Sequence, residues 1–250
     1  MSTPLVIAHR GFSGKFPENT KRAFVEAIAV NGCNGFETDV HLSSDNEPVI
    51  IHDSTLDRTT DAKGPVRAMK FKDLRELDVG SWMEPQFSNE RILHLDELLE
   101  LSMKNDKVLN IELKNYETHY PNIEQIVIDR IRAVGAQNHV FLSSFNHISM
   151  GICKSIDAEI KTGFLYFQPL LEAEKYAAGH KMNAIHPMHQ LLNFEPLLVG
   201  RAHSMGVAIN TWTVNNEDDM RSCISLGVDS IITDFPDKLA EVLVHHIPNN

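Results

Sequence analysis

Residues 5–29 read LVIAHRGFSGKFPENTKRAFVEAIA: a short apolar run, a polar loop and an amphipathic segment. The apolar run, residues 5–8, predicts a buried strand. In residues 20–29, Ala23, Phe24, Ala27 and Ile28 recur at helical spacing, which predicts a helix with one buried face. This stretch is therefore one strand–helix unit, the repeating element of proteins built around a parallel sheet.

The same unit recurs along the rest of the chain. Helical patterns such as residues 123–134 lie between apolar runs, and the eight predicted strands are residues 5–8, 35–40, 108–113, 140–143, 162–166, 184–185, 207–212 and 230–233. Eight such units point to an α/β fold of the TIM (β/α)8 barrel type. The sequence has no GxGxxG fingerprint that would favour an open dinucleotide-binding sheet. We expect a single domain over residues 1–250.

One segment interrupts this rhythm after the second strand. The chain turns at Ser43-Ser44-Asp45-Asn46 and returns through residues 48–51 to His52, which predicts a hairpin. Because the next barrel strand begins only near residue 108, we expect residues 55–106 to be an insertion that caps the barrel mouth. Barrel enzymes carry their chemistry at that end. The insertion would either influence substrate specificity or serve only as a structural cap.

The charge balance limits the class of partner. The chain has 34 Asp and Glu against 23 Lys and Arg, a formal net charge of −11. This excess argues against a nucleic-acid surface, which needs clustered Lys and Arg. A small anionic substrate is still compatible with it if positive charge is placed locally. Arg10, Lys114 and a metal ion are the candidates for that charge.

The cysteines and the N-terminus indicate the compartment. Cys33, Cys153 and Cys223 are far apart and form no CxxC pair, so they suggest neither a disulfide framework nor a zinc site. The first residues show no signal-peptide pattern, and no stretch approaches the roughly 20 apolar residues of a membrane-spanning helix. We expect a cytoplasmic protein without stable membrane attachment. The sequence does not predict its oligomeric state.

Three carboxylates form a candidate metal site. Glu37 and Asp39 lie two residues apart on a predicted strand, so both side chains point to the same face. Two buried carboxylates repel each other and need compensation, which a divalent cation supplies. Glu112, on the next barrel strand, offers a third ligand. Oxygen ligands favour Mg²⁺ or Ca²⁺, with Mn²⁺ also possible, over zinc. The alternative is a structural network in which Glu112 and Lys114 pair with each other or with the arginines.

Two histidines and two basic residues complete the candidate site. His9 ends the first strand and His52 ends the hairpin, so both reach the same cavity. With an unperturbed pKa of about 6.5, one imidazole suits a general base and the other a general acid. Arg10 offers a planar fork of donors for phosphate oxygens, and Lys114 is a second phosphate contact. The set predicts metal-assisted cleavage of a phosphate ester.

Other positions have both a functional and a structural interpretation. Asn19 or Thr20 is expected to cap the helix that follows, and Glu18 could additionally orient a histidine or arginine of the cavity. Trp212 and Asn210 share one face of the seventh strand. The indole would either pack against a substrate's glycerol or head group, or fill the barrel core.

The order of these motifs resembles that of glycerophosphodiester phosphodiesterases, and most closely the short cytoplasmic bacterial members. The resemblance covers nearly the whole chain. It rests on His9-Arg10-Gly11, Pro17-Glu18-Asn19-Thr20, Glu37-x-Asp39, His52-Asp53, Leu56-Asp57-Arg58-Thr59, Glu112-x-Lys114, Trp212-Thr213-Val214-Asn215 and the closing segment 227–236. It implies a TIM barrel that hydrolyses deacylated phospholipids to sn-glycerol 3-phosphate and an alcohol.

The resemblance also implies roles for individual residues: the metal ligands Glu37, Asp39 and Glu112, the acid/base pair His9 and His52, and the phosphate contacts Arg10 and Lys114. Attack on phosphorus by the glycerol 2-hydroxyl or by water would use the same residues. A related enzyme acting on intact lipids, like sphingomyelinase D or phosphatidylinositol phospholipase C, would need an apolar or basic interfacial surface, which the sequence does not reveal. A barrel that binds without catalysis is not expected to keep every one of these groups.

Overall fold

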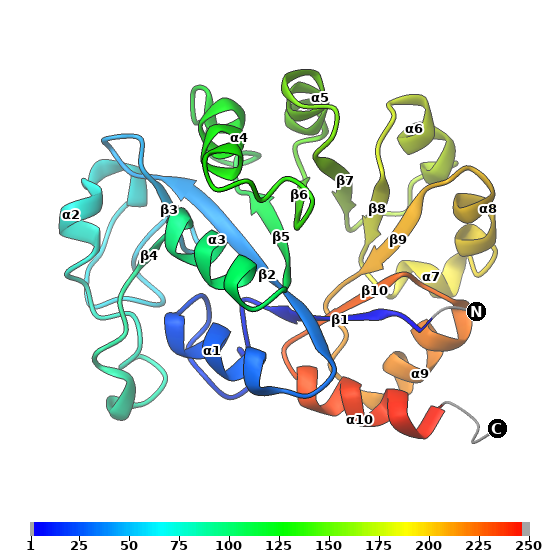
Figure 1. The fold of residues 1–250 in the computed structure, drawn as a ribbon, viewed down its shortest axis with the longest axis horizontal. Coiled ribbons are helices and arrows are strands. Elements are labelled where there is room, and N and C mark those ends of the chain that lie inside the picture. The colour runs from blue at the N-terminus through cyan, green and yellow to red at the C-terminus, as the bar shows by residue number, and fades with distance from the viewer. Residues whose placement is uncertain (1–2, 247–250) are drawn as a thin grey trace.

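The computed structural model describes residues 3–246. Eight parallel strands form a barrel with helices around it (Figure 1). The barrel strands are β1 (Leu5–His9), β2 (Cys33–Leu42), β5 (Val108–Leu113), β6 (Val140–Ser144), β7 (Lys161–Tyr166), β8 (Ala184–Pro187), β9 (Ala208–Thr211) and β10 (Ser230–Thr233).

The barrel closes through β1, which pairs in parallel with both β10 and β2. The other neighbours follow the chain in order from β2 through β5 to β10. The predicted TIM barrel is therefore confirmed, and each predicted strand overlaps an observed one. The largest shifts are at β2, which is two residues longer at each end, and at β8, which runs on to Pro187, and β9 ends one residue before Trp212.

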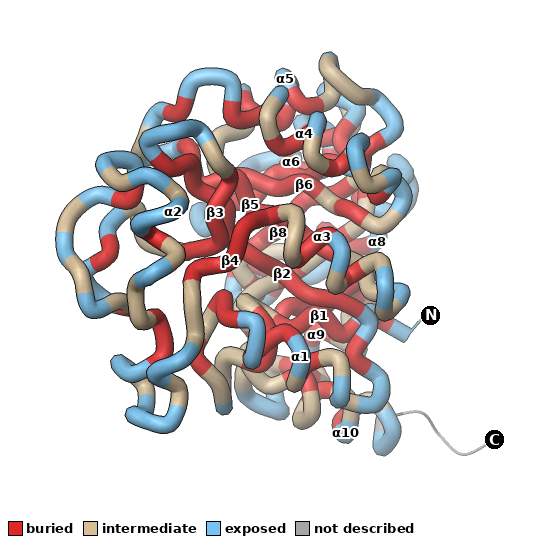
Figure 2. Tube along the Cα trace, turned by 60° about the vertical axis from the view of Figure 1, so that its left-hand side comes forward, coloured by how far each residue is buried: buried red, intermediate tan, exposed pale blue. Residues whose placement is uncertain are grey.

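The helices cover the outside of the barrel because each buries one apolar face. In α1, the Thr20 hydroxyl accepts a hydrogen bond from the Ala23 amide, so Thr20 is the N-cap, and Phe24 packs against Phe36 of β2 with ring centroids 5.6 Å apart. Figure 2 shows buried residues concentrated in the strands and exposed residues on the outer turns. The barrel helices are α1 (Lys21–Ala29), α3 (Leu95–Lys104), α4 (Ile123–Ala133), α5 (His147–Ile156), α6 (Ala173–Gly179), α7 (Leu191–Phe194), α8 (Leu198–Ser204), α9 (Glu217–Leu226) and α10 (Pro236–His246).

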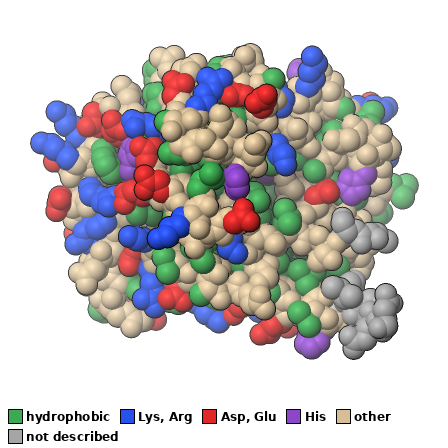
Figure 3. Space-filling view, in the orientation of Figure 1, with side chains coloured by type: hydrophobic (Ala, Val, Ile, Leu, Met, Phe, Trp, Pro, Cys, Tyr) green, Lys and Arg blue, Asp and Glu red, His purple; other side chains and the backbone are tan. Residues whose placement is uncertain are grey.

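The predicted hairpin after β2 is present. β3 (Pro48–Ile50) pairs antiparallel with β2, and β4 (Leu93–His94) pairs antiparallel with β3. Between β3 and β4 lie two single-turn 3₁₀ helices and α2 (Phe71–Leu74), which enclose a small separate core that includes Leu56, Val66 and Leu74. We call this segment, which leaves the barrel wall after β3, the excursion. Lys, Arg, Asp and Glu side chains crowd the surface over α2 and β3 (Figure 3), so the outer face of the excursion is polar.

Residues 95–104 of the expected insertion form α3, and its Leu95, Leu98 and Leu99 lie in the main hydrophobic core. This helix occupies the place of the second helix of the barrel. The excursion from the barrel wall thus lies mainly between β3 and α3.

Two further observations bear on the sequence analysis. No helix within residues 3–246 combines the length and hydropathy needed to cross a membrane. All three cysteines are free thiols and buried.

Candidate active site

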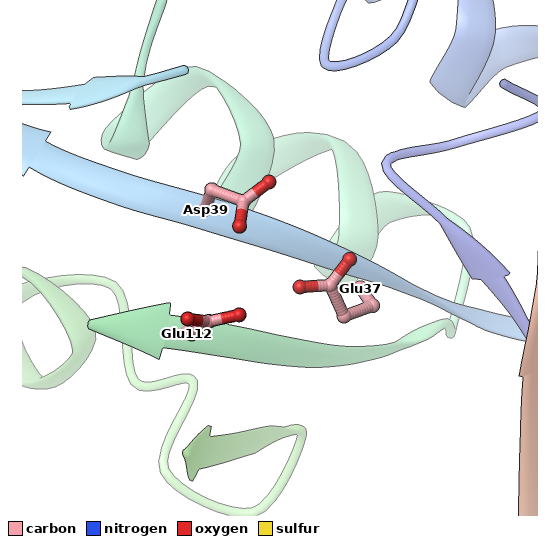
Figure 4. Close-up of side chains that lie close together, drawn as sticks. All are labelled: Glu37, Asp39 and Glu112. Atoms are coloured by element: carbon pink, nitrogen blue, oxygen red, sulfur yellow. The ribbon is translucent and has the colours of Figure 1, made fainter. Parts of the chain in front are cut away.

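Neighbouring strands bring three carboxylates together at one end of the barrel. Glu37 and Asp39 point from β2 and Glu112 from β5, where Asp39 and Glu112 are paired across the two strands. One oxygen of each lies within 4.8 Å of the others, and all three residues are buried. Figure 4 shows the carboxylates directed toward one another. The two-residue period of β2 thus gives the juxtaposition expected from the sequence.

These carboxylates have strongly perturbed ionisation. Burial, reinforced by Asp39 and Glu112, raises the pKa of Glu37 well above its usual value. Burial also raises the pKa of Glu112, to about 7, against the opposing effect of Lys114. Asp39 is buried too, but Arg10 and Lys114 outweigh its desolvation and hold its pKa far below the ordinary range. The protein's own cations therefore stabilise one full negative charge here, but not three.

The carboxylates fit a divalent cation. Asp39 Oδ1 is buried and has no hydrogen-bond partner among the described residues. An unsatisfied buried carboxylate oxygen is costly, and ligation by a cation removes that cost. Three carboxylates and no sulfur or nitrogen ligand make a site for a hard cation such as Mg²⁺, Ca²⁺ or Mn²⁺.

His9 lies beside this cluster at the end of β1. Its Nδ1 donates to Asp234 Oδ1 over 2.6 Å, and its Nε2 is 3.8 Å from Glu37 Oε2. Asp234, just past β10, also accepts from Asn215 Nδ2 and from the Ser13 hydroxyl. These hydrogen bonds, the one from His9 foremost, outweigh burial and lower the pKa of Asp234 to about 2. The aspartate therefore fixes the imidazole with Nε2 toward the cavity.

His52 is held in a similar way by its neighbour in the chain. Its Nδ1 donates to Asp53 Oδ1 over 2.6 Å, and its Nε2 accepts a hydrogen bond from Lys114 Nζ at 3.1 Å. Burial lowers the pKa of His52, and the charges of Arg10 and Lys114 lower it further against the opposing charge of Asp39. This environment favours the neutral imidazole.

The two basic residues predicted to contact phosphate lie against the carboxylates. Arg10 Nε is 3.2 Å from Asp39 Oδ2. Lys114 Nζ is 2.9 Å from Glu112 Oε1. Burial alone would lower the pKa of Lys114, but the negative charges of Glu112 and Asp39 outweigh it and raise that pKa. The ion pair of Glu112 and Lys114 considered in the sequence analysis is thus present inside the same cavity as the candidate metal ligands.

A network that the sequence analysis did not anticipate supports these residues. Arg58 donates to both oxygens of Asp53 and to both oxygens of Glu18, over 2.7 to 2.9 Å. Glu18 in turn accepts from Arg10 Nη1 at 3.0 Å. The Arg58 guanidinium therefore links Asp53, which binds His52, to Glu18, which binds Arg10. The expectation that Glu18 orients an arginine agrees with this contact.

Asn19 also belongs to the site rather than to the helix cap. It adopts a left-handed conformation with φ of 58°, and its Nδ2 donates to Asp39 Oδ2 at 2.9 Å. Its Oδ1 accepts from the Thr38 hydroxyl. The sequence contains only positional signals for the residues that support the site. Asp53 directly follows His52, Asp234 lies in the closing segment, and Glu18, Asn19 and Arg58 lie within the short motifs.

The cavity between these groups has a volume of about 230 Å³. One side is polar and the other is apolar, with Phe145 and Leu165 facing the charged residues. The polar and aromatic lining comprises His9, Arg10, Glu37, His52, Asn110, Glu112, Lys114, Tyr116, Phe145, Trp212 and Thr213.

Trp212 lines the cavity and also has a structural contact. Its indole N–H donates to the backbone oxygen of His186 over 2.8 Å, and its ring meets Phe145 edge-on at 5.5 Å. Asn210 lies one layer deeper. Its side chain contacts His186 Nε2, and both residues line a second cavity, of about 220 Å³, at the N-terminal end of the strands. Trp212 is therefore at the candidate site, whereas Asn210 is not.

Comparisons with known proteins show the family of this chain. The model of the glycerophosphoryl diester phosphodiesterase family matches residues 9–238. A glycerophosphodiester phosphodiesterase of Caldanaerobacter subterraneus subsp. tengcongensis is 39% identical over 239 residues, covering 96% of this chain and 97% of that protein.

Solved structures show the same architecture. A phosphodiesterase from Oleispira antarctica, in complex with the product sn-glycerol-3-phosphate, matches with a TM-score of 0.85 and 29% identity, covering 97% of each chain. A glycerophosphodiester phosphodiesterase from Agrobacterium tumefaciens matches with a TM-score of 0.83 and 27% identity over 95% of this chain and 99% of that one.

The crowded carboxylates predict opposite effects of one substitution with and without a cation. In EDTA, Glu37→Gln should leave the free energy of unfolding unchanged or raise it by about 1 kcal/mol, because burial and the neighbouring carboxylates already disfavour the charge of Glu37 and an amide carries none. Adding Mg²⁺, Ca²⁺ or Mn²⁺ should raise the melting temperature of the unsubstituted protein but not that of the variant. Thermal unfolding measures both effects.

The matched control is Glu100→Gln, since Glu100 is an exposed glutamate on α3. It should change neither the melting temperature in EDTA nor the response to cations. A melting temperature of the unsubstituted protein that ignores all three cations would contradict the metal site.

Proposed function

This chain belongs to the glycerophosphoryl diester phosphodiesterase family, and from that premise we propose a metal-dependent, two-histidine mechanism for its hydrolysis of glycerophosphodiesters. The observation that carries the proposal is the single cavity in which three buried carboxylates lie beside two imidazoles, each hydrogen-bonded through Nδ1 to its own aspartate. The products are sn-glycerol 3-phosphate and the free alcohol of the head group.

Glu37, Asp39 and Glu112 would hold one divalent cation. When bound, the cation supplies positive charge that polarises the phosphodiester and stabilises the charge that develops in the transition state. Arg10 and Lys114 border the same carboxylates, so their N–H groups are placed to bind the non-bridging phosphate oxygens. Because the chain as a whole is acidic, only the local positive charge of Arg10, Lys114 and the cation would attract a small anionic substrate.

The two histidines divide the proton transfers. His52, kept neutral next to Lys114 Nζ, fits the base that removes the proton of the attacking hydroxyl. His9 lies between Asp234 and Glu37 with its Nε2 directed toward the cavity, and it fits the acid that protonates the leaving alcohol. The bond from phosphorus to the alcohol oxygen breaks. The glycerol 2-hydroxyl and water are both compatible attacking groups.

The size and lining of the cavity support a small substrate. A space of about 230 Å³ suits a glycerol phosphate moiety, and the related Oleispira antarctica enzyme was solved with sn-glycerol-3-phosphate. On the apolar side, the partly exposed Trp212 would pack against the carbon atoms of the glycerol or head group. The three free cysteines support the reducing cytoplasm as the site of action.

The excursion supports the site through Arg58. This residue is exposed, but its four hydrogen bonds fix the carboxylates of Glu18 and Asp53, which orient Arg10 and His52. We propose on this basis that the part of residues 55–106 that precedes α3 caps the mouth of the barrel and positions catalytic groups.

An assay of the purified protein tests the proposed function. Release of glycerol 3-phosphate from glycerophosphoethanolamine should stop in EDTA and return when Mg²⁺, Ca²⁺ or Mn²⁺ is added, because the carboxylates alone cannot supply the positive charge. Hydrolysis that continues unchanged in EDTA would rule out metal dependence. An absence of hydrolysis with every cation, and with glycerophosphocholine and glycerophosphoinositol as well, would overturn the proposed function.

Removing either imidazole should abolish most of the turnover without unfolding the protein. His9→Gln and His52→Gln are each expected to lower kcat by about 10²- to 10⁴-fold, since each removes one proton transfer. Steady-state kinetics measures the loss, and circular dichroism checks the fold. His245→Gln, at an exposed position on α10, is the control and should retain full activity. Normal kinetics in both active-site variants would remove the acid/base assignment.

The excursion has its own test. Arg58→Gln should lower kcat by about 10- to 100-fold, as expected when a group that orients active-site residues is lost. Arg58→Lys should recover little, because an ammonium cannot bind two carboxylates in the same forked geometry. Arg67→Gln changes an exposed arginine of the same segment and should have no effect. Wild-type kcat in Arg58→Gln would show that the excursion is only a structural cap.

A further inference from the structure

Exposed apolar side chains gather on one side of the active-site end of the barrel. Phe167, Leu170 and Leu171 lie in the loop after β7, and Phe194 and Leu197 lie in the segment after β8. We call these five residues the apolar rim. Leu171, Phe194 and Leu197 are 85%, 78% and 74% exposed. Apolar side chains this exposed and this close together are unusual in a monomer and mark a binding surface.

The rim borders a groove of about 330 Å³ between the end of β7 and helices α7 and α8. Its charged lining residue, Glu195, is paired with Arg201 at 2.7 Å. The rest of the lining is largely hydrocarbon, and includes Tyr166, Leu170, Leu171, Leu191, Phe194 and Leu198. The groove is therefore suited to an apolar chain rather than to a charged group.

Aromatic rings connect the apolar rim with the catalytic cavity. Phe145 lines that cavity, and its ring centroid lies 5.7 Å from Phe167 of the rim and 5.5 Å from Trp212. Along β7, Leu165 lines the cavity and the next residue, Tyr166, lines the groove. Because consecutive strand residues point to opposite faces, the cavity and the groove lie on either side of β7. A molecule bound at the catalytic carboxylates and extending outward over the end of β7 meets Phe145 and then Phe167 of the rim.

The charges near the rim indicate which apolar partner fits. Residues 167–172 and 188–197 contain no Lys or Arg. The nearest cations on the following helices are compensated, since Lys175 pairs with Glu172 and Arg201 pairs with Glu174 and Glu195. The surface therefore offers nothing to an anionic bilayer, which binds clustered basic residues. It fits an uncharged hydrocarbon chain.

We propose that the enzyme also hydrolyses monoacyl glycerophosphodiesters, with the acyl chain lying over the apolar rim and in the groove while the phosphodiester occupies the catalytic cavity. This inference rests on the proposed function, because it uses the same reacting groups. The rim places the lipid tail outside the cavity of about 230 Å³, which therefore need only hold the polar part of the substrate.

The chemistry is an ordinary hydrolysis with no redox change. Water adds across the bond between phosphorus and the head-group alcohol. The hydroxyl of water ends on phosphorus and one proton on the alcohol oxygen, which gives a monoacylglycerol 3-phosphate and the free alcohol. A chain esterified at the 1-position leaves the 2-hydroxyl free, so the route through that hydroxyl is open as well.

The experiment compares lysophosphatidylcholine with glycerophosphocholine, in the presence of the cation that supports activity. The purified enzyme should release choline from both. Leu171→Ser and Phe194→Ser should each lower kcat/KM for the monoacyl substrate by about tenfold, because each removes a large apolar contact, and should leave kcat/KM for glycerophosphocholine within about twofold. Val244→Ser, an equally exposed apolar residue on α10, should change neither.

Chain length supplies a second measurement. With soluble substrates kept below their micelle concentrations, KM of the wild-type enzyme should fall as the acyl chain is lengthened, and this fall should be weaker in Leu171→Ser. Such a dependence arises from contact with single chains and not from adsorption to micelles.

Several results would overturn the proposal. Cleavage of glycerophosphocholine without cleavage of the monoacyl substrate would do so while leaving the proposed function intact, and so would equal losses on both substrates in the rim variants. A dimer that dissociates on Leu171→Ser, with unchanged kinetics, would show that a second copy covers the rim. Hydrolysis of neither substrate would overturn this inference, and it would overturn the proposed function as well only if glycerophosphoethanolamine and glycerophosphoinositol are also left intact.

Discussion

The structure of the site depends on one electrostatic constraint: three carboxylates are buried within reach of one another. Pairing of β2 with β5 imposes this closeness, because it places Asp39 directly beside Glu112. Arg10 and Lys114 compensate part of the charge but not all of it, as the raised pKa values of Glu37 and Glu112 show. The remaining deficit of positive charge is what a bound divalent cation would compensate, and this is the basis of the proposed metal-dependent mechanism.

The groups around the carboxylates are held from several parts of the chain. His9 depends on Asp234 from the opposite end of the sequence, whereas His52 depends on the adjacent Asp53. Arg58 joins the excursion to this arrangement through two carboxylates at once. A barrel supplies eight strand ends that converge on one mouth, so residues from distant segments meet there without long loops. Rigidity at the reacting groups then comes from hydrogen bonds between those segments.

The two sides of the mouth differ in chemical character. The side of β1, β2 and the excursion carries charged groups in paired networks, and the side of β7 and β8 carries the apolar rim. A substrate with a charged phosphodiester and an apolar tail matches this division. No apolar interfacial surface is evident in the sequence, because the rim residues come from two short segments that are separated along the chain and show no shared periodicity. The surface exists only where β7 and β8 lie side by side.

The sequence by itself determined the eight strand–helix units, the shared face of Glu37 and Asp39, and the set of acidic, basic and imidazole groups, because alternation along a strand and periodicity along a helix are local properties. Its motifs also placed the chain in its family. Only the tertiary structure decided that Asn19 binds Asp39 instead of capping α1, that Arg58 links Glu18 to Asp53, and that Asn210 faces away from the site. These outcomes depend on contacts between residues far apart in the chain or on depth along the barrel axis, which no local pattern encodes.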